Sequence, residues 1–135
     1  MTVRTNARAL LAAFILVAAA LMPTSVLAEL ADYEFQLVEP TVKTGDATII
    51  AVRLLNKKSG VAVSDAVIFA SRLDMAPDSM SEMTTKLTPL PTTSPGVYSF
   101  KANVSMAGGW QLSLAAKVQG ETGTVENKLI IKAEQ

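Results

Sequence analysis

The stretch VYSFKANVSMAGGWQLSLAAKV, from Val97 to Val118, carries the clearest structural pattern in the chain. Apolar side chains occupy every second position from Tyr98 to Val104, and the alternation resumes at Trp110. A period of two is typical of a β-strand with one buried face. The intervening glycines indicate a turn. We therefore expect two strands joined by a short connection.

Similar runs lie on both sides of this stretch, and glycines or polar turns separate them. No apolar stretch beyond residue 28 keeps a helical period for three turns. About seven strands in one domain predict an all-β fold, an immunoglobulin-like antiparallel β-sandwich. The further candidate strands are YEFQLVE (33–39), DATIIAVRLLN (46–56), DAVIFASRLD (65–74), TTKLT (84–88) and TVENKLIIKA (124–133).

Two of these regions carry more specific expectations. The run at 46–56 is dense in apolar residues, which suits a strand covered on both faces or near the centre of the sandwich. The segment TPLPTTSPG (88–96) contains three prolines and is expected to be a rigid extended connection that covers a sheet edge.

Residues 1–28 are predicted to be a secretory signal peptide. Arg4 and Arg8 precede an apolar run over 9–22, and small residues end at Ala28. The run is shorter than the roughly 20 apolar residues that span a bilayer. We expect cleavage after Ala28, a periplasmic domain over 29–135, and no stable membrane anchor; an uncleaved anchor is the alternative.

The composition excludes several functional classes. The chain has no cysteine and no histidine, so disulfides, Ser-His or Cys-His catalytic pairs and histidine zinc sites are ruled out. Beyond residue 28 there are ten basic and 12 acidic residues, a net charge of −2. This balance argues against nucleic-acid binding. The acidic residues have no companion nucleophile, and we do not expect an enzyme.

Methionines gather in the stretch SRLDMAPDSMSEM, residues 71–83, and once more before the glycine pair. A thioether is a soft, neutral ligand that suits Cu(I), and Ag(I) adventitiously. In an antiparallel sandwich, the predicted loops after the third and fifth strands emerge at the same end. We therefore predict a Cu(I) site whose ligands are any three of Met75, Met80, Met83 and Met106.

Neighbouring residues would support such a site. Carboxylates could offset the charge of the metal from a second shell, and the indole of Trp110 could cap it by a cation–π contact. The carboxylates in question are those of Asp74, Asp78 and Glu82.

Packing offers an alternative interpretation. Methionines under a long loop often form a cluster that plugs the end of a sandwich. SMSE at 79–82 matches a helical capping box, and Pro77 suits the first position of a helical turn. Trp110, at the start of a strand, would then belong to the core.

The motifs also resemble a known family. The chain over about 33–132 is similar to the YtkA-like and FixH-like exported domains. Those domains are immunoglobulin-like sandwiches, and several are found with copper export or with the assembly of copper-containing respiratory oxidases. FixH-like proteins usually keep a membrane-spanning N-terminus, whereas this one looks cleaved. The resemblance rests on Asp74, Met75, Pro77 and Met80, and on Met106, Gly108, Gly109 and Trp110.

Two functions remain open from the sequence. The first is a soluble periplasmic protein that binds Cu(I) and acts in copper buffering, transfer or tolerance, with a copper-export or oxidase-assembly component as its partner. The second is a non-metal interaction module that docks another envelope protein by its sheet edge or its methionine-rich pole.

Overall fold

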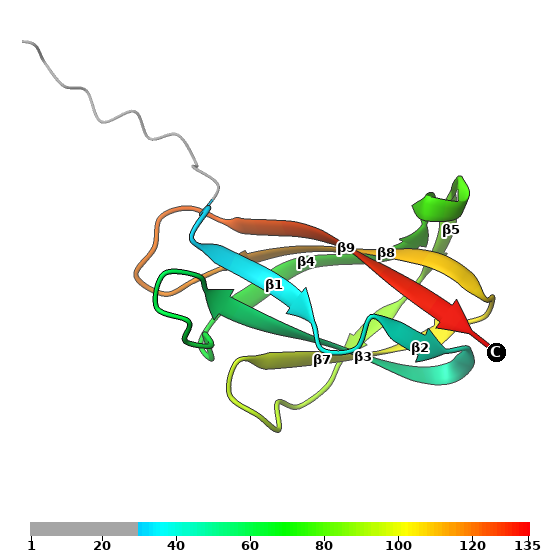
Figure 1. Ribbon diagram of the computed structural model, residues 1–135, viewed down its shortest axis with the longest axis horizontal. Helices are drawn as coiled ribbons and strands as arrows, with labels where there is room; N and C mark the ends of the chain where they lie inside the picture. The colour runs from blue at the N-terminus through cyan, green and yellow to red at the C-terminus, as the bar shows by residue number, and fades with distance from the viewer. Residues whose placement is uncertain (1–29) are drawn as a thin grey trace, which may run out of the picture.

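Residues 30–135 are described by a computed structural model, in which nine strands form two facing sheets (Figure 1). The predicted signal peptide and its cleavage site lie outside these residues. The all-β, immunoglobulin-like sandwich predicted from the alternation is confirmed. Among residues 30–135, no helix is both long enough and apolar enough to cross a membrane.

The first sheet has four strands in the order β1-β3-β7-β6, all antiparallel to their neighbours. Its strands are β1 (Tyr33–Leu37), β3 (Gly45–Asn56), β6 (Leu87–Pro89) and β7 (Val97–Val104).

The second sheet has five strands in the order β2-β9-β8-β4-β5. Its strands are β2 (Thr41–Lys43), β4 (Val67–Met75), β5 (Met80–Thr85), β8 (Gly108–Lys117) and β9 (Val125–Glu134). A 3-10 helix, η1 (Ala76–Asp78), connects β4 to β5.

Three details of the predicted topology were wrong. There are nine strands instead of about seven, because the chain crosses between the sheets with very short strands. The short strand β2 pairs parallel to β9, so the sandwich is not purely antiparallel. The candidate strand at 84–88 is divided between the end of β5 and the start of β6. Lys86 marks the crossing from one sheet to the other.

The core lies between the sheets and is built from the alternating positions of the long strands. On β8, Trp110, Leu112 and Leu114 are buried, as the alternation predicts. The dense run in β3 is not covered on both faces, because Ile50 faces the core whereas Ile49 is 51% exposed. The outer face of an antiparallel sheet can lie against water, so this face needs no cover.

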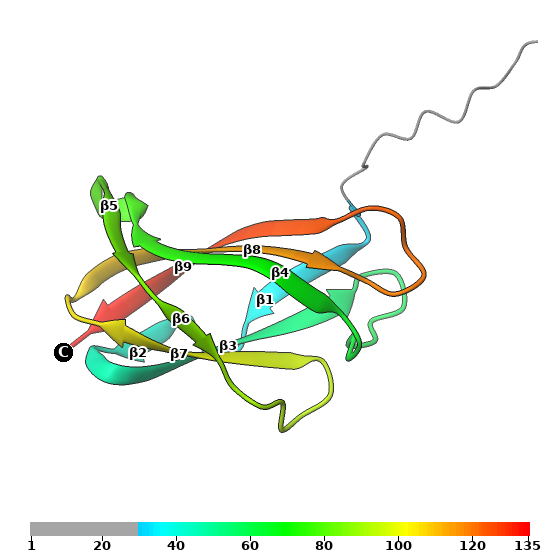
Figure 2. The ribbon, with the colours of Figure 1, turned by 180° about the vertical axis from the view of Figure 1, so that it is seen from behind.

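Figure 2 shows how the chain leaves β5 and continues into β6 at the edge of the opposite sheet. Pro89 pairs with Phe100, and the Leu90 N–H then donates to the Ser99 carbonyl oxygen at 2.9 Å. The proline-containing segment therefore begins along a sheet edge, as predicted. Prolines are tolerated there because an edge strand needs fewer N–H donors.

Candidate methionine site

The methionine-rich stretch forms a β-hairpin and not the loop that its polarity predicted. Residues up to Met75 belong to β4, and residues from Met80 onward belong to β5, with these two methionines paired across the hairpin. Between them, η1 carries Pro77 in its first turn, as expected, and Ser79 closes the turn with φ of 61°. The capping-box interpretation is wrong, because Ser79 follows the helix in a left-handed conformation and leads into a strand.

The four methionines differ in their access to solvent. Met75 is fully buried in the core, as the packing interpretation predicts. Met80 is half-buried against the core, whereas Met83 and Met106 are 38% and 41% exposed. Three of the four methionine side chains are therefore at least partly open to solvent, and that of Met75 is not.

The hairpin turn docks onto the start of β8. The Gly109 N–H donates to the Asp78 carboxylate at 3.1 Å. A Cβ added to Gly108 would lie 2.2 Å from Asp78 Oδ2 and 3.1 Å from Met75 Cε. A Cβ on Gly109 would lie 2.8 Å from Pro77 Cβ. Both glycines are therefore needed for the close approach of these segments. From the sequence, the two glycines predicted only a turn.

These contacts bring two distant parts of the chain to one end of the sandwich, which we call the methionine pole (residues 75–83 and 105–110). Met106 lies in the connection between β7 and β8, directly before the glycines that receive the turn. Its carbonyl oxygen accepts a hydrogen bond from Trp110 Nε1 at 3.0 Å. All four methionines of the predicted site therefore belong to the same pole.

Trp110 does not offer an exposed aromatic face to a metal. Its side chain is buried in the core, and its one donor is used by the Met106 carbonyl. The expectation of a cation–π cap is thus corrected, because the alternation of β8 turns this ring inward. The indole instead fixes the position of the Met106 connection.

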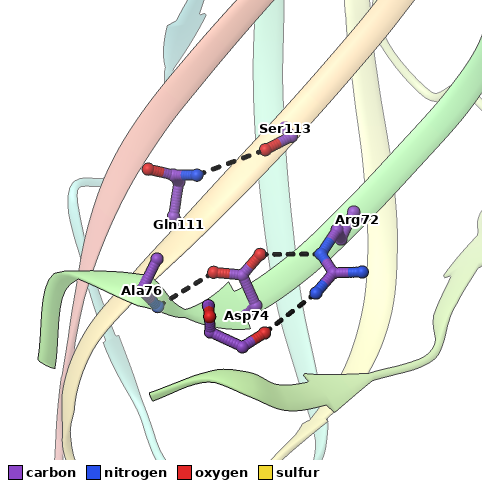
Figure 3. Close-up of polar contacts among 6 residues, drawn as sticks. Arg72, Asp74, Ala76, Gln111 and Ser113 are labelled. Atoms are coloured by element: carbon purple, nitrogen blue, oxygen red, sulfur yellow. Dashed lines mark hydrogen bonds and ion pairs between the residues drawn. The ribbon is translucent and has the colours of Figure 1, made fainter. Parts of the chain in front are cut away.

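Asp74 is engaged within the hairpin and is not free to offset a charge (Figure 3). The carboxylate is buried on β4, accepts from Arg72 Nε at 2.8 Å and accepts from the Ala76 N–H at 2.9 Å. Arg72 Nη2 also donates to the Ser81 carbonyl oxygen at 2.8 Å, across the hairpin. The hydrogen bond from Arg72 lowers the pKa of Asp74, against the opposing effect of burial.

Arg72 is the residue that sequence reasoning missed at this pole. Its signal was the spacing of two residues from Asp74, which places both side chains on the same face of a strand.

The other two predicted carboxylates have different surroundings: Asp78 accepts a hydrogen bond from the Gly109 N–H, and Glu82 is exposed. Within residues 30–135, no three carboxylates converge to hold a metal, so a metal at this pole would depend on sulfur.

The sequence model of the family described as YtkA-like matches residues 27–115. The chain belongs to the YtkA-like family. No curated protein matches the sequence of this YtkA-like domain. Among solved structures, the Lin-41 filamin domain is similar at 18% identity, with 76% of this chain and 92% of that chain covered and a TM-score of 0.46. The ZirS C-terminal domain is similar at 10% identity, with 76% of this chain and 66% of that chain covered and a TM-score of 0.45.

Proposed function

We propose that this YtkA-like domain is exported to the periplasm and binds Cu(I) through the thioethers of Met80, Met83 and Met106. The observation that carries the proposal is the clamp between the Asp78 carboxylate and the Gly109 N–H. This clamp holds the segments that bear the three partly exposed methionines at one end of the sandwich.

The chemistry of the three side chains fits a soft monovalent ion. Thioethers are neutral and unprotonated at any pH, and they bind Cu(I) in preference to hard cations. A site with three neutral ligands keeps one positive charge, which the exposed carboxylate of Glu82 could offset from outside. Met75 is assigned to the core, because a ligand role would require it to leave a fully buried position.

The exposure of the sulfurs suits transfer more than permanent storage. Met83 and Met106 are partly open to solvent, so an acceptor could replace them one sulfur at a time. A role in copper buffering or delivery follows, with a copper-export or oxidase-assembly component of the envelope as the receiving partner. The predicted signal peptide over 1–28 supports this location.

The test is a titration with Cu(I) against a competing chelator, on the chain from Glu29 onward. Leucine is close to methionine in volume, so leucine variants keep the packing and remove the sulfur. The triple variant Met80→Leu, Met83→Leu and Met106→Leu should lose binding. Met75→Leu is the matched control and should bind like the wild type. Equal Cu(I) affinity of the triple variant and the wild type would refute the proposal.

The second candidate function is docking of another envelope protein at the same pole. Met83 and Met106 leave adaptable apolar surface exposed there, and methionine-rich surfaces accommodate varied partners. The leucine variants separate the two candidates, because they retain the apolar surface. Partner capture that persists in the triple variant under a copper chelator would favour docking.

A further inference from the structure

Strand β4 has an open edge over most of its length. On one side it pairs with β8 from Val67 to Asp74, but on the other side β5 reaches only the stretch from Leu73 to Met75. Beyond Thr85 the chain leaves for the opposite sheet (Figure 2). On the side away from β8, the backbone from Val67 to Arg72 therefore has no strand beside it among the described residues.

The other end of this open edge is fixed by a tyrosine from the facing sheet. Tyr98 Oη accepts from the Ala66 N–H at 3.1 Å and donates to the Val63 carbonyl oxygen at 2.8 Å. These bonds hold the chain that leads into β4 against the first sheet. The crossing at Lys86 bounds one end of the edge, and the Tyr98 contacts bound the other, which leaves room for one short strand.

The open edge carries apolar side chains that have no cover. Val67 and Phe69 are 61% and 55% exposed. A bulge between Ile68 and Ala70 displaces Phe69 from the regular ladder with β8. Beside the edge lies a hollow of 380 Å³ whose lining includes Phe69, Leu90 and Phe100. An added strand could thus bury apolar surface as well as pair its backbone.

Charges of opposite sign lie at the two ends of the edge. Lys86 lies at the end next to β5, where Arg72 is already paired with Asp74, and Asp65 lies just before the strand at the other end. Within residues 30–135, neither Asp65 nor Lys86 forms an ion pair. If a second copy of this edge lies antiparallel to the first, Asp65 of each copy comes close to Lys86 of the other. Both ends of the contact then bring together opposite charges.

We propose that the occupant of this edge is β4 of a second copy of the chain. A twofold axis across the edge makes the contact isologous, so each charge complementarity occurs twice. The two five-stranded sheets then join into one continuous sheet, and the two Phe69 side chains lie near the axis. The pairing covers the unpaired backbone groups that an open edge strand otherwise exposes.

The test is the mass of the chain from Glu29 onward, which contains every described strand, measured by sedimentation equilibrium across its soluble concentration range. The wild type should dimerise. Phe69→Lys should reduce it to a monomer, because two like charges would meet near the axis. Ile49→Lys, at a similarly exposed strand position on the other sheet, is the matched control and should remain dimeric. A monomeric wild type, or a dimeric Phe69→Lys variant, would overturn the proposal.

A charge-reversal pair tests the orientation of the contact. Asp65→Lys and Lys86→Asp should each raise the dimer dissociation constant by roughly two- to thirtyfold, because two exposed ion pairs are lost. The double variant should recover most of the affinity, since the charges are then exchanged between the ends. Additive losses in the double variant would contradict the antiparallel arrangement.

Discussion

Replacing Gly108 by alanine should destabilise the domain, because it combines backbone strain with a contact that breaks the clamp to Asp78. The backbone at this position has φ of 136°, which side-chain-bearing residues rarely adopt, and the strain costs about 1–3 kcal/mol. The new Cβ would also lie 2.2 Å from Asp78 Oδ2, so the carboxylate must withdraw. Losing its hydrogen bond to the Gly109 N–H costs about 1 kcal/mol more.

We therefore expect the free energy of unfolding of Gly108→Ala to fall by about 2–4 kcal/mol. For a domain of this size, that corresponds to a drop in Tm of roughly 10–20 °C. Urea unfolding can be followed by the fluorescence of Trp110, because it is the only tryptophan of the chain and is buried near the altered contact.

Two other glycines provide matched controls. Gly120 has φ of 83° with no atom within 4 Å of an added Cβ, so Gly120→Ala should show the strain alone, about 1–2 kcal/mol. At Gly45 an added Cβ would meet only Thr48 Oγ1 at 3.6 Å, an ordinary contact, and Gly45→Ala should stay within about 1 kcal/mol of wild type.

A double variant tests the cause of the effect. If the clash with the carboxylate matters, Asp78→Ala and Gly108→Ala together should cost about 1 kcal/mol less than the sum of the single changes. The reasoning is refuted if Gly108→Ala is no more destabilising than Gly120→Ala, or if the two changes at the clamp are simply additive.

Three further outcomes are expected. The folded-state pKa of Asp74 lies below its ordinary value of 3.8, so its contribution to stability is complete above that value and is lost as pH falls through the lower pKa. Acid unfolding curves should show this loss in the wild type, and it should be absent in Asp74→Asn. Leu112→Ala should lower the free energy of unfolding by about 2–5 kcal/mol, since the side chain is fully buried. Ile130→Ala, at a 54% exposed position on the adjacent strand, should change it by less than about 1 kcal/mol in urea titrations. Mass spectrometry of the protein from the periplasm should find a chain that begins at Glu29, and an intact residue 1 would contradict cleavage after Ala28.

The position of the methionines at one end of the sandwich could be predicted from the sequence. The count of strands between Met75 and Met106 predicts that both lie at one end, and the contacts of Gly108 with Asp78 and Met75 place them there. The same reasoning treated the residues from Met75 to Met83 as a loop. Their polarity is typical of a loop, but it arises here because β5 is an edge strand with solvent on its open side.

The solvent exposure of each methionine could not be predicted from the sequence, because it depends on how the facing sheet packs against it. Met75 and Met83 have the same type of side chain, yet one lies in the core and the other lies on the surface. Likewise, the role of Asp74 changed once Arg72 and the Ala76 N–H were found to hold both carboxylate oxygens.

The order of apolar and polar residues determined that this chain forms strands and buries one face of each, because a period of two is a local property of the backbone. It also determined that the methionine pole carries thioethers and no thiols or imidazoles, since the chain has no cysteine and no histidine. Only the tertiary structure decided which methionines are open to solvent, that β5 leaves β4 after three pairs, and that Asp78 clamps the turn onto β8. Those features arise from contacts between residues far apart in the chain, and no local pattern encodes which surfaces such contacts cover.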